Sequence, residues 1–295
     1  MLTDADLPSL WHGLGIPGVC DVHTHFMPEA VMRSVWAYFD AAGDNYGVPW
    51  PIEYRWDDDA RLNHLRALGV RKFTALVYAH KPGMAEWLSR WALDFASHVP
   101  DCLPTATFYP EPEAERYVSE ALARGAQVFK VHLQVGDFDP RDPLLEPVWG
   151  LLADAAVPVL IHCGSAPLAG RFTGPGPIGE VLDRFPRLRV IVAHLGADEF
   201  EVFLDMVQAR ENTWLDTTMA LTDFMQQLRP FPVGRLAQLR ALSGQGKVLF
   251  GSDFPNIPYP YAHQVEVLSD HGLDMPEVLW RAPVRLFGGQ ASGLL

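Results

Sequence analysis

Five histidines and one aspartate stand at the ends of short apolar runs, and they are the residues with which this chain could do chemistry. The first run carries His23 and His25, and later runs end at His132, His162, His194 and Asp253. Alternate residues of a strand share a face, so His23 and His25 are expected to point the same way, at a spacing that suits two imidazole ligands. The pattern therefore predicts a metal site.

The elements that must position these residues follow from the period of the apolar runs. Eight short β-rich runs are separated by stretches long enough for a helix, which predicts βαβ units and a parallel sheet. The expected strands are 19–22, 73–78, 103–108, 127–131, 157–161, 189–193, 213–217 and 247–251. The expected helices are 57–68, 84–98, 113–124, 144–155, 178–185, 198–209 and 235–243, with a closing amphipathic helix over 275–287.

Eight such units in about 250 residues are typical of a closed (β/α)8 TIM barrel, and we expect residues 1–295 to form one domain of this α/β class. A doubly wound open sheet is the alternative. It normally carries a glycine-rich phosphate turn after an early strand, and the segment DVHTHF at 21–26 contains no glycine.

The segment 26–56 is the longest stretch without clear periodicity. It is rich in aromatic residues, namely Trp36, Tyr38, Phe39, Tyr46, Trp50, Tyr54 and Trp56. A long excursion after a first strand is typical of a functional loop or a cover on the rim of a barrel. We expect it to be an ordered cover over the barrel mouth.

In a barrel of this type the active site forms at the carboxyl ends of the strands. Closure brings the first and last strands side by side, so Asp253 should lie next to His23 and His25, with His162 facing them. Three neutral imidazoles and a carboxylate suit zinc or a similar divalent ion, with a position left open for water or substrate. Asp253 could remove a proton from that water, and His194 could orient it or protonate a leaving group.

Three further residues could contact the substrate. Arg171, in the loop after the fifth strand, could pair with a carboxylate through both ends of its guanidinium, although an ordinary surface salt bridge is the alternative. Lys130 shares a strand face with His132, and both could line the pocket. Lys130 could contact an anionic group of the substrate. If carboxylated, it could instead bridge two metal ions, and His194 would then be a ligand of the second ion. A buried structural ion pair is the other interpretation of Lys130.

Composition indicates which binding partners and which cellular compartment to expect. The net charge of −13 leaves no basic footprint for nucleic acid or an anionic membrane. No 18-residue uncharged apolar stretch occurs, and the first residues are acidic rather than typical of a secretory signal, so we expect a cytoplasmic location. Cys20, Cys102 and Cys163 show no paired spacing, which predicts buried thiols rather than disulfides or a thiolate zinc site.

Five motifs in barrel order resemble the amidohydrolase superfamily, and within it the amidohydrolase 2 group that includes aminocarboxymuconate semialdehyde decarboxylase. They are DVHTHFMP at 21–28, FKVH at 129–132, VLIHCG at 159–164, IVAHLG at 191–196 and LFGSDFP at 249–255. The resemblance implies a single divalent ion, usually zinc with Mn2+ or Fe2+ as alternatives, held by His23, His25, His162 and Asp253. It implies that His194 is a catalytic acid, base or electrophile. One departure is the segment 281–283, which replaces the asparagine usual before the final Arg-Leu-Phe-Gly.

Such an apparatus allows two reactions on a small organic substrate. With an ester, lactone or amide, activated water hydrolyses a bond; with an aromatic or enoic carboxylate, protonation at carbon releases CO2. Shared ligands do not decide between them, because pocket residues select the reaction. We predict the hydrolase, with a non-oxidative decarboxylase as the alternative and a catalytically silent binding barrel as the third possibility. Barrels of this group often form homodimers.

Overall fold

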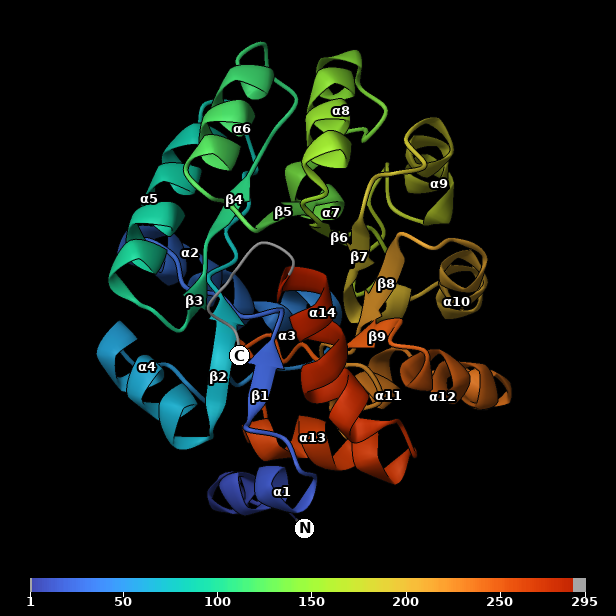
Figure 1. The fold of residues 1–295 in the computed structure, drawn as a ribbon. Coiled ribbons are helices and arrows are strands. Elements are labelled where there is room, and N and C mark those ends of the chain that lie inside the picture. The colour runs from blue at the N-terminus through green and yellow to red at the C-terminus, as the bar shows by residue number, and fades with distance from the viewer. Residues whose placement is uncertain (1, 289–295) are drawn as a thin grey trace. The chain divides into compact units, whose positions relative to one another are not determined.

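The computed structural model describes residues 2–288. The described part of the chain divides into two compact units, the first made of residues 2–74 and 216–288 and the second of residues 75–215. Both contain parallel strands connected by helices (Figure 1).

The first unit contains the beginning and the end of the chain. Strand β1 (Val19–Asp21) pairs in parallel with β2 (Val70–Thr74), and Asp21 lies opposite Phe73. Beyond β1, the amide of Val22 donates to the carbonyl of Phe250, which follows β9 (Val248–Leu249), at 2.9 Å. A parallel bridge between Thr24 and Phe254 continues this pairing. The first and last strand segments therefore lie side by side, as the sequence predicted.

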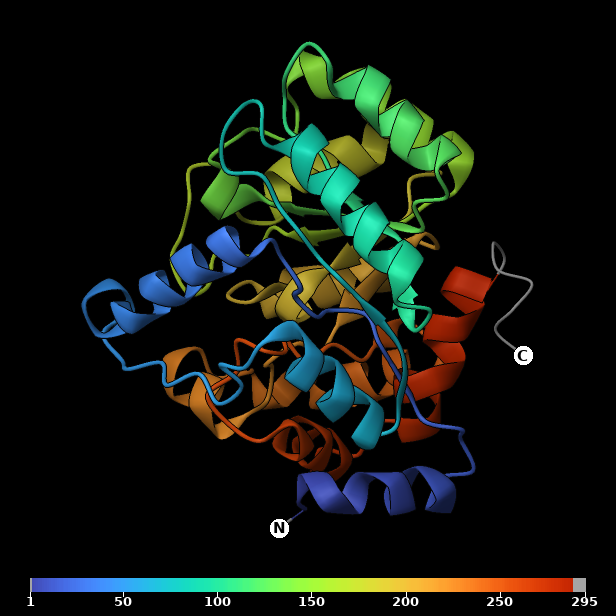
Figure 2. The same cartoon turned by 90° about the vertical axis from the view of Figure 1, so that its left-hand side faces the viewer.

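Helices surround these strands. They are η1 (Asp4–Asp6), α1 (Leu7–Gly13), α2 (Glu29–Asp40), α3 (Ala42–Tyr46), α4 (Asp58–Ala67), α11 (Asp223–Leu228), η4 (Val233–Arg235), α12 (Leu236–Gly244), α13 (Tyr261–Asp270), the π-helical turn η5 (Glu277–Arg281) and α14 (Ala282–Gly288). Figure 2 shows α1 beside α13. Asp4 lies in η1, directly before α1, and its carboxylate accepts from the amide of Ala262 in the first turn of α13 at 2.8 Å.

The aromatic segment 26–56 is folded and carries α2 and α3. The ring centroid of Trp50 lies 5.0 Å from that of Phe39 and 4.7 Å from that of Phe224. Its indole donates to the backbone carbonyl of Asn256 at 2.7 Å, and the indole of Trp36 donates to the side chain of Asn256 at 3.1 Å. These contacts fix the segment to the loop after β9. Its role as a cover over a barrel mouth stays a prediction.

The second unit contains a parallel sheet in the order β4-β5-β6-β7-β8 (Figure 1). Its strands are β4 (Thr105–Thr107), β5 (Val128–His132), β6 (Val159–His162), β7 (Val190–Val192) and residues 213–215 of β8 (Thr213–Asp216), preceded by the short β3 (Cys102–Leu103). Its helices are α5 (Ala85–His98), α6 (Ala114–Ala123), α7 (Leu133–Gly136), η2 (Pro143–Leu145), α8 (Glu146–Ala155), α9 (Pro175–Arg184), η3 (Ala193–Gly196) and α10 (Phe200–Ala209). β6 and β7 are buried throughout, as strands covered on both faces are.

The expected helices are present close to their predicted limits, but α1, α2, α3, α7, α11 and α13 were not predicted, and some strands differ. The expected strand 73–78 is β2 at Val70–Thr74, and the expected run 103–108 is split into β3 and β4. An apolar run reports burial rather than pairing, and Ala75, Leu76 and Val77 are fully buried outside any strand. The three cysteines are free and buried, as expected. Among the described residues, no helix has the length and apolar character needed to cross a membrane.

Candidate metal centre and histidine stack

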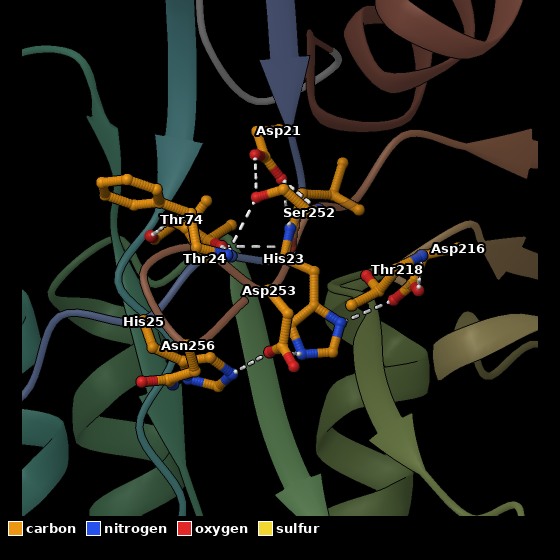
Figure 3. A network of polar contacts seen from close by, with 12 residues as sticks. Asp21, His23, Thr24, His25, Thr74, Asp216, Thr218, Ser252, Asp253 and Asn256 are labelled. Atoms are coloured by element: carbon orange, nitrogen blue, oxygen red, sulfur yellow. Dashed lines mark hydrogen bonds and ion pairs between the residues drawn. The ribbon is translucent and has the colours of Figure 1, made fainter. Parts of the chain in front are cut away.

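In the first unit, His23, His25 and Asp253 form a buried group of ligand atoms. One nitrogen from each ring and one carboxylate oxygen lie within 4.8 Å of one another. Asp253 Oδ1 is 3.0 Å from His25 Nε2 and 3.6 Å from His23 Nε2 (Figure 3). The sequence predicted this grouping, although Asp253 is more than two hundred positions from the two histidines.

Backbone hydrogen bonds between the strand ends bring the three residues together. The amide of His25 donates to the carbonyl of Phe254 at 2.7 Å, and the amide of Asp253 donates to the carbonyl of His23 at 2.8 Å. Gly251 permits this close approach, because a Cβ at that position would lie 2.7 Å from His23 Cβ. The backbone pairing thus places the two imidazoles beside the carboxylate.

Asp216, at the end of β8, orients His23. His23 Nδ1 lies 2.9 Å from Asp216 Oδ2, and the other oxygen of Asp216 accepts from the amide of Thr218 at 3.0 Å (Figure 3). A carboxylate can only accept, so His23 Nδ1 donates to Asp216, and Nε2 is the nitrogen directed toward Asp253. This carboxylate–histidine arrangement is the usual outer support of a metal ligand. Sequence reasoning missed Asp216, although it is a carboxylate at a strand end like Asp253.

Asp21 holds the segment that carries Asp253. Its fully buried carboxylate accepts from the amide and hydroxyl of Ser252 at 3.1 and 2.6 Å, from the hydroxyl of Tyr261 at 2.7 Å and from the amide of His23 at 3.2 Å. Burial raises the pKa of Asp21 to about 7, against the opposing effect of these donors. The residue ties the end of β1 to the neighbour of Asp253 and was not identified from the sequence.

The donor set fits a divalent ion. Two imidazole nitrogens and a carboxylate oxygen are ligands that zinc and similar ions take. The two imidazoles are nearly inaccessible to solvent, and the Asp253 side chain is 13% exposed. The backbone of Asp253 has a φ of 72°, in the left-handed region that is costly for a residue other than glycine. Such strain collects at functional sites, where it aims a side chain.

In the second unit, the structure brings together the other three strand-end histidines. The rings of His132 and His162 stack with centroids 3.8 Å apart and an interplanar angle of 10°, because the two residues are opposite each other on β5 and β6. The His194 ring meets His162 edge-on at 4.8 Å. His194 also has a left-handed φ of 57°. The three imidazoles thus form one group, in which two rings stack and the third meets them edge-on, and we call this group the histidine stack.

The two cationic candidates differ in exposure. Lys130, in β5, is 1% exposed, and its backbone carbonyl accepts from the hydroxyl of Thr107 at 2.7 Å. Arg171 is exposed, and its guanidinium carbon lies 5.0 Å from the centroid of the Phe172 ring. Contact of either residue with a substrate stays a prediction.

Comparison with known proteins places this arrangement in a family. The amidohydrolase 2 family model, described as amidohydrolase, matches residues 20–289. No curated protein matches the chain in sequence.

Three solved structures illustrate the likeness of fold. An uncharacterised TIM-barrel protein from Bordetella bronchiseptica is 18% identical with a TM-score of 0.72, and 92% of this chain covers 99% of that one. A 5-carboxyvanillate decarboxylase from Sphingomonas paucimobilis is 18% identical with a TM-score of 0.63, with coverages of 92% and 99%. A probable 2-pyrone-4,6-dicarboxylic acid hydrolase from Acinetobacter baumannii is 14% identical with a TM-score of 0.60, again with coverages of 92% and 99%.

These likenesses confirm the predicted TIM-barrel fold and the predicted superfamily. The family is one of enzymes that typically depend on a metal, and the group of His23, His25 and Asp253 supplies suitable ligands. With residues 20–289 matched by its model, this chain belongs to the amidohydrolase family.

Proposed function

We propose that this protein is a metal-dependent hydrolase that cleaves an ester, lactone or amide bond of a small organic substrate. The observation that carries the proposal is the buried group of His23, His25 and Asp253, with His23 oriented by Asp216. A buried cluster of this kind, supported from behind by a carboxylate, is suited to hold an ion and costs stability without one.

His23, His25 and Asp253 would hold the ion together with His162, and zinc suits this donor set best, with Mn2+ or Fe2+ as alternatives. When bound, such an ion lowers the pKa of water towards ~7 and polarises a carbonyl.

The chain's own residues move the protons. Asp253, whose Oδ1 faces the imidazole of His25, accepts a proton from the water that attacks the carbonyl carbon. His194 donates a proton to the oxygen or nitrogen of the leaving group as its bond to carbon breaks. Lys130, His132 and Arg171 bind the substrate, the two cations meeting its anionic groups.

A decarboxylase is the second candidate, favoured by the likeness in fold to a 5-carboxyvanillate decarboxylase. In that reaction His194 would place its proton on the substrate carbon that loses CO2. The same residues serve both reactions, so the products must separate them. We further propose that the enzyme works in the cytoplasm and forms a homodimer.

Metal content tests the proposal first. After dialysis against a chelator and reconstitution with zinc, we expect about one equivalent per chain in the wild type and far less in His23→Ala. The matched control is His98→Ala, which removes an exposed histidine of α5 and should leave the metal content unchanged. Less than about a tenth of an equivalent in the wild type, without activation by added metal, would refute the metalloenzyme and favour a silent barrel.

Product analysis then separates the two reactions. Lactones, esters and aromatic carboxylates are offered to the zinc-loaded protein while acid release and CO2 are followed together. Acid release from a lactone, ester or amide supports the hydrolase. Evolution of CO2 without hydrolysis would overturn it in favour of the decarboxylase.

A further inference from the structure

Within the second unit, Glu199, directly before α10, is hydrogen-bonded to the loop after β6. The carboxylate of Glu199 accepts from the amide of Ser165 at 3.1 Å and, through its other oxygen, from the hydroxyl of the same residue. Glu199 also lies against Gly174, where an added Cβ would be 3.6 Å from Oε1. Gly174 returns the loop to β6 by donating its amide to the carbonyl of Cys163 at 2.6 Å. Glu199 therefore holds the first part of the loop through Ser165 and lies near its end at Gly174.

The residue after Ser165 meets the histidine stack. The carbonyl oxygen of Ala166 lies 2.9 Å from His162 Nε2, and the amide of Ala166 donates to the carbonyl of Ala197 at 2.9 Å. The packing is close, because a Cβ on Gly164 would lie 2.0 Å from the oxygen of Ala197. A small displacement of Ser165 would thus move the Ala166 carbonyl relative to the imidazole.

That contact selects a tautomer of His162. A carbonyl only accepts, so Nε2 of His162 donates to Ala166, and Nδ1 is the ring nitrogen with which His162 could bind an ion. A histidine that binds a metal usually donates its other ring N–H to such a partner, which orients the ring. Here the partner is a loop carbonyl rather than a carboxylate, so its position depends on what holds the loop.

We propose that Glu199 is a positioning residue that, through Ser165, holds the Ala166 carbonyl against His162 and so makes Nδ1 the coordinating nitrogen of that ligand. The proposal rests on the proposed function, in which His162 is a ligand. Hydrogen bonds to a charged carboxylate are stronger than those between neutral groups, and two from one residue fix its orientation as well as its place. The backbone bond of Ala166 to Ala197 sets the distance between the loops, and Glu199 sets the direction of the carbonyl.

The experiment compares Glu199→Ala and Glu199→Gln with the wild type and with Glu201→Gln, which changes an exposed carboxylate on α10. Long-range 1H–15N spectra of the metal-free proteins report the histidine tautomers, with His162 assigned by its absence in His162→Gln. Zinc affinity is measured separately by competition with a chromophoric chelator.

We expect wild type and Glu201→Gln to show the Nε2–H tautomer of His162. Glu199→Ala should show a mixture of tautomers and bind zinc about 10- to 100-fold more weakly, the usual effect of removing an outer support. Glu199→Gln should lie between them, because its amide can still accept from the Ser165 hydroxyl but its NH2 group opposes the Ser165 amide.

An Nδ1–H tautomer in the wild type would overturn the proposal. So would a Glu199→Ala protein whose tautomer is unchanged and whose zinc affinity is within threefold of the wild type. If the wild type binds no zinc, the proposed function fails, and the tautomers of the metal-free proteins still decide whether Glu199 positions His162.

Discussion

Replacing Asp216 by asparagine tests the orientation of His23 with the smallest change of shape. In the wild type, one carboxylate oxygen faces His23 Nδ1 at 2.9 Å and the other accepts from the amide of Thr218 at 3.0 Å. Asparagine has a single acceptor oxygen. If that oxygen meets the Thr218 amide, the NH2 group faces His23 and forces Nδ1 to accept, which moves the proton to Nε2. If it meets His23, the NH2 group opposes the Thr218 amide.

Either arrangement weakens the metal site. Asp216 is fully buried and His23 is 1% exposed, so water cannot replace the lost contact. Losing an outer carboxylate typically lowers metal affinity by about 10- to 100-fold, which corresponds to about 1.4–2.7 kcal/mol. We expect a zinc dissociation constant raised by that factor in Asp216→Asn, together with a shift of His23 toward the Nε2–H tautomer.

The assay is zinc competition with a chromophoric chelator at fixed pH, beside urea unfolding of the metal-free protein. The matched control is Glu277→Gln, which alters a nearly buried carboxylate of the same unit that pairs with Arg285. The control should lose stability with its zinc affinity unchanged. An Asp216→Asn protein that binds zinc within threefold of the wild type would refute the reasoning.

Three further predictions concern stability. Burial raises the pKa of Asp4, but its hydrogen bonds lower it more, so the pKa in the folded protein lies below the ordinary 3.8. The stability that Asp4 contributes is therefore fully present above pH 3.8 and is lost as the pH falls through the lower folded-state pKa. Asp4→Asn should therefore have a lower Tm than the wild type at pH 7, and its Tm should fall less than that of the wild type on acidification below about pH 4. Parallel curves of Tm against pH for the two proteins would contradict this. Arg61 is 3% exposed; its Nη2 pairs with the partly exposed Asp58, but its buried Nε and Nη1 make no hydrogen bond. Arg61→Met should therefore leave the free energy of unfolding unchanged or raise it by about 1–2 kcal/mol, and a loss above about 2 kcal/mol by urea unfolding would argue against the prediction. Gly164→Ala should lower the free energy of unfolding by about 1–3 kcal/mol, because its Cβ would overlap Ala197. Gly150→Ala, whose Cβ would meet open space in α8, should not lower it, and equal effects of the two substitutions would exclude the overlap as the cause.

Local spacing made part of the candidate site predictable. His23 and His25 are two residues apart, so strand geometry alone places them on one face. The order of the apolar runs predicted the barrel, and barrel closure predicted that Asp253 would lie beside them. Several helices were similarly accessible, since they carry their own periodicity and end signals, whereas α1, α2 and α13 were not predicted.

The residues that orient the ligands were not accessible in this way. Asp216 is 193 positions from His23, and Glu199 is 34 positions from Ser165, so neither pairing leaves a local pattern. Strand limits failed for a related reason, because an apolar run such as residues 75–77 records burial whether or not a neighbouring strand pairs with it. Arg171 was selected by residue type, and the direction of a loop side chain depends on its surroundings.

The sequence by itself thus determined the kind of fold, the family and the identity of the candidate ligands, because these depend on residue types at short spacing and on the order of elements. The tertiary structure decided which ring nitrogens of His23 and His162 donate to a partner, which groups accept from them and where the backbone is strained. Those properties arise from hydrogen bonds between segments remote in the chain. They are fixed only when folding brings a single acceptor, such as Asp216 Oδ2 or the Ala166 carbonyl, within reach of a ring nitrogen.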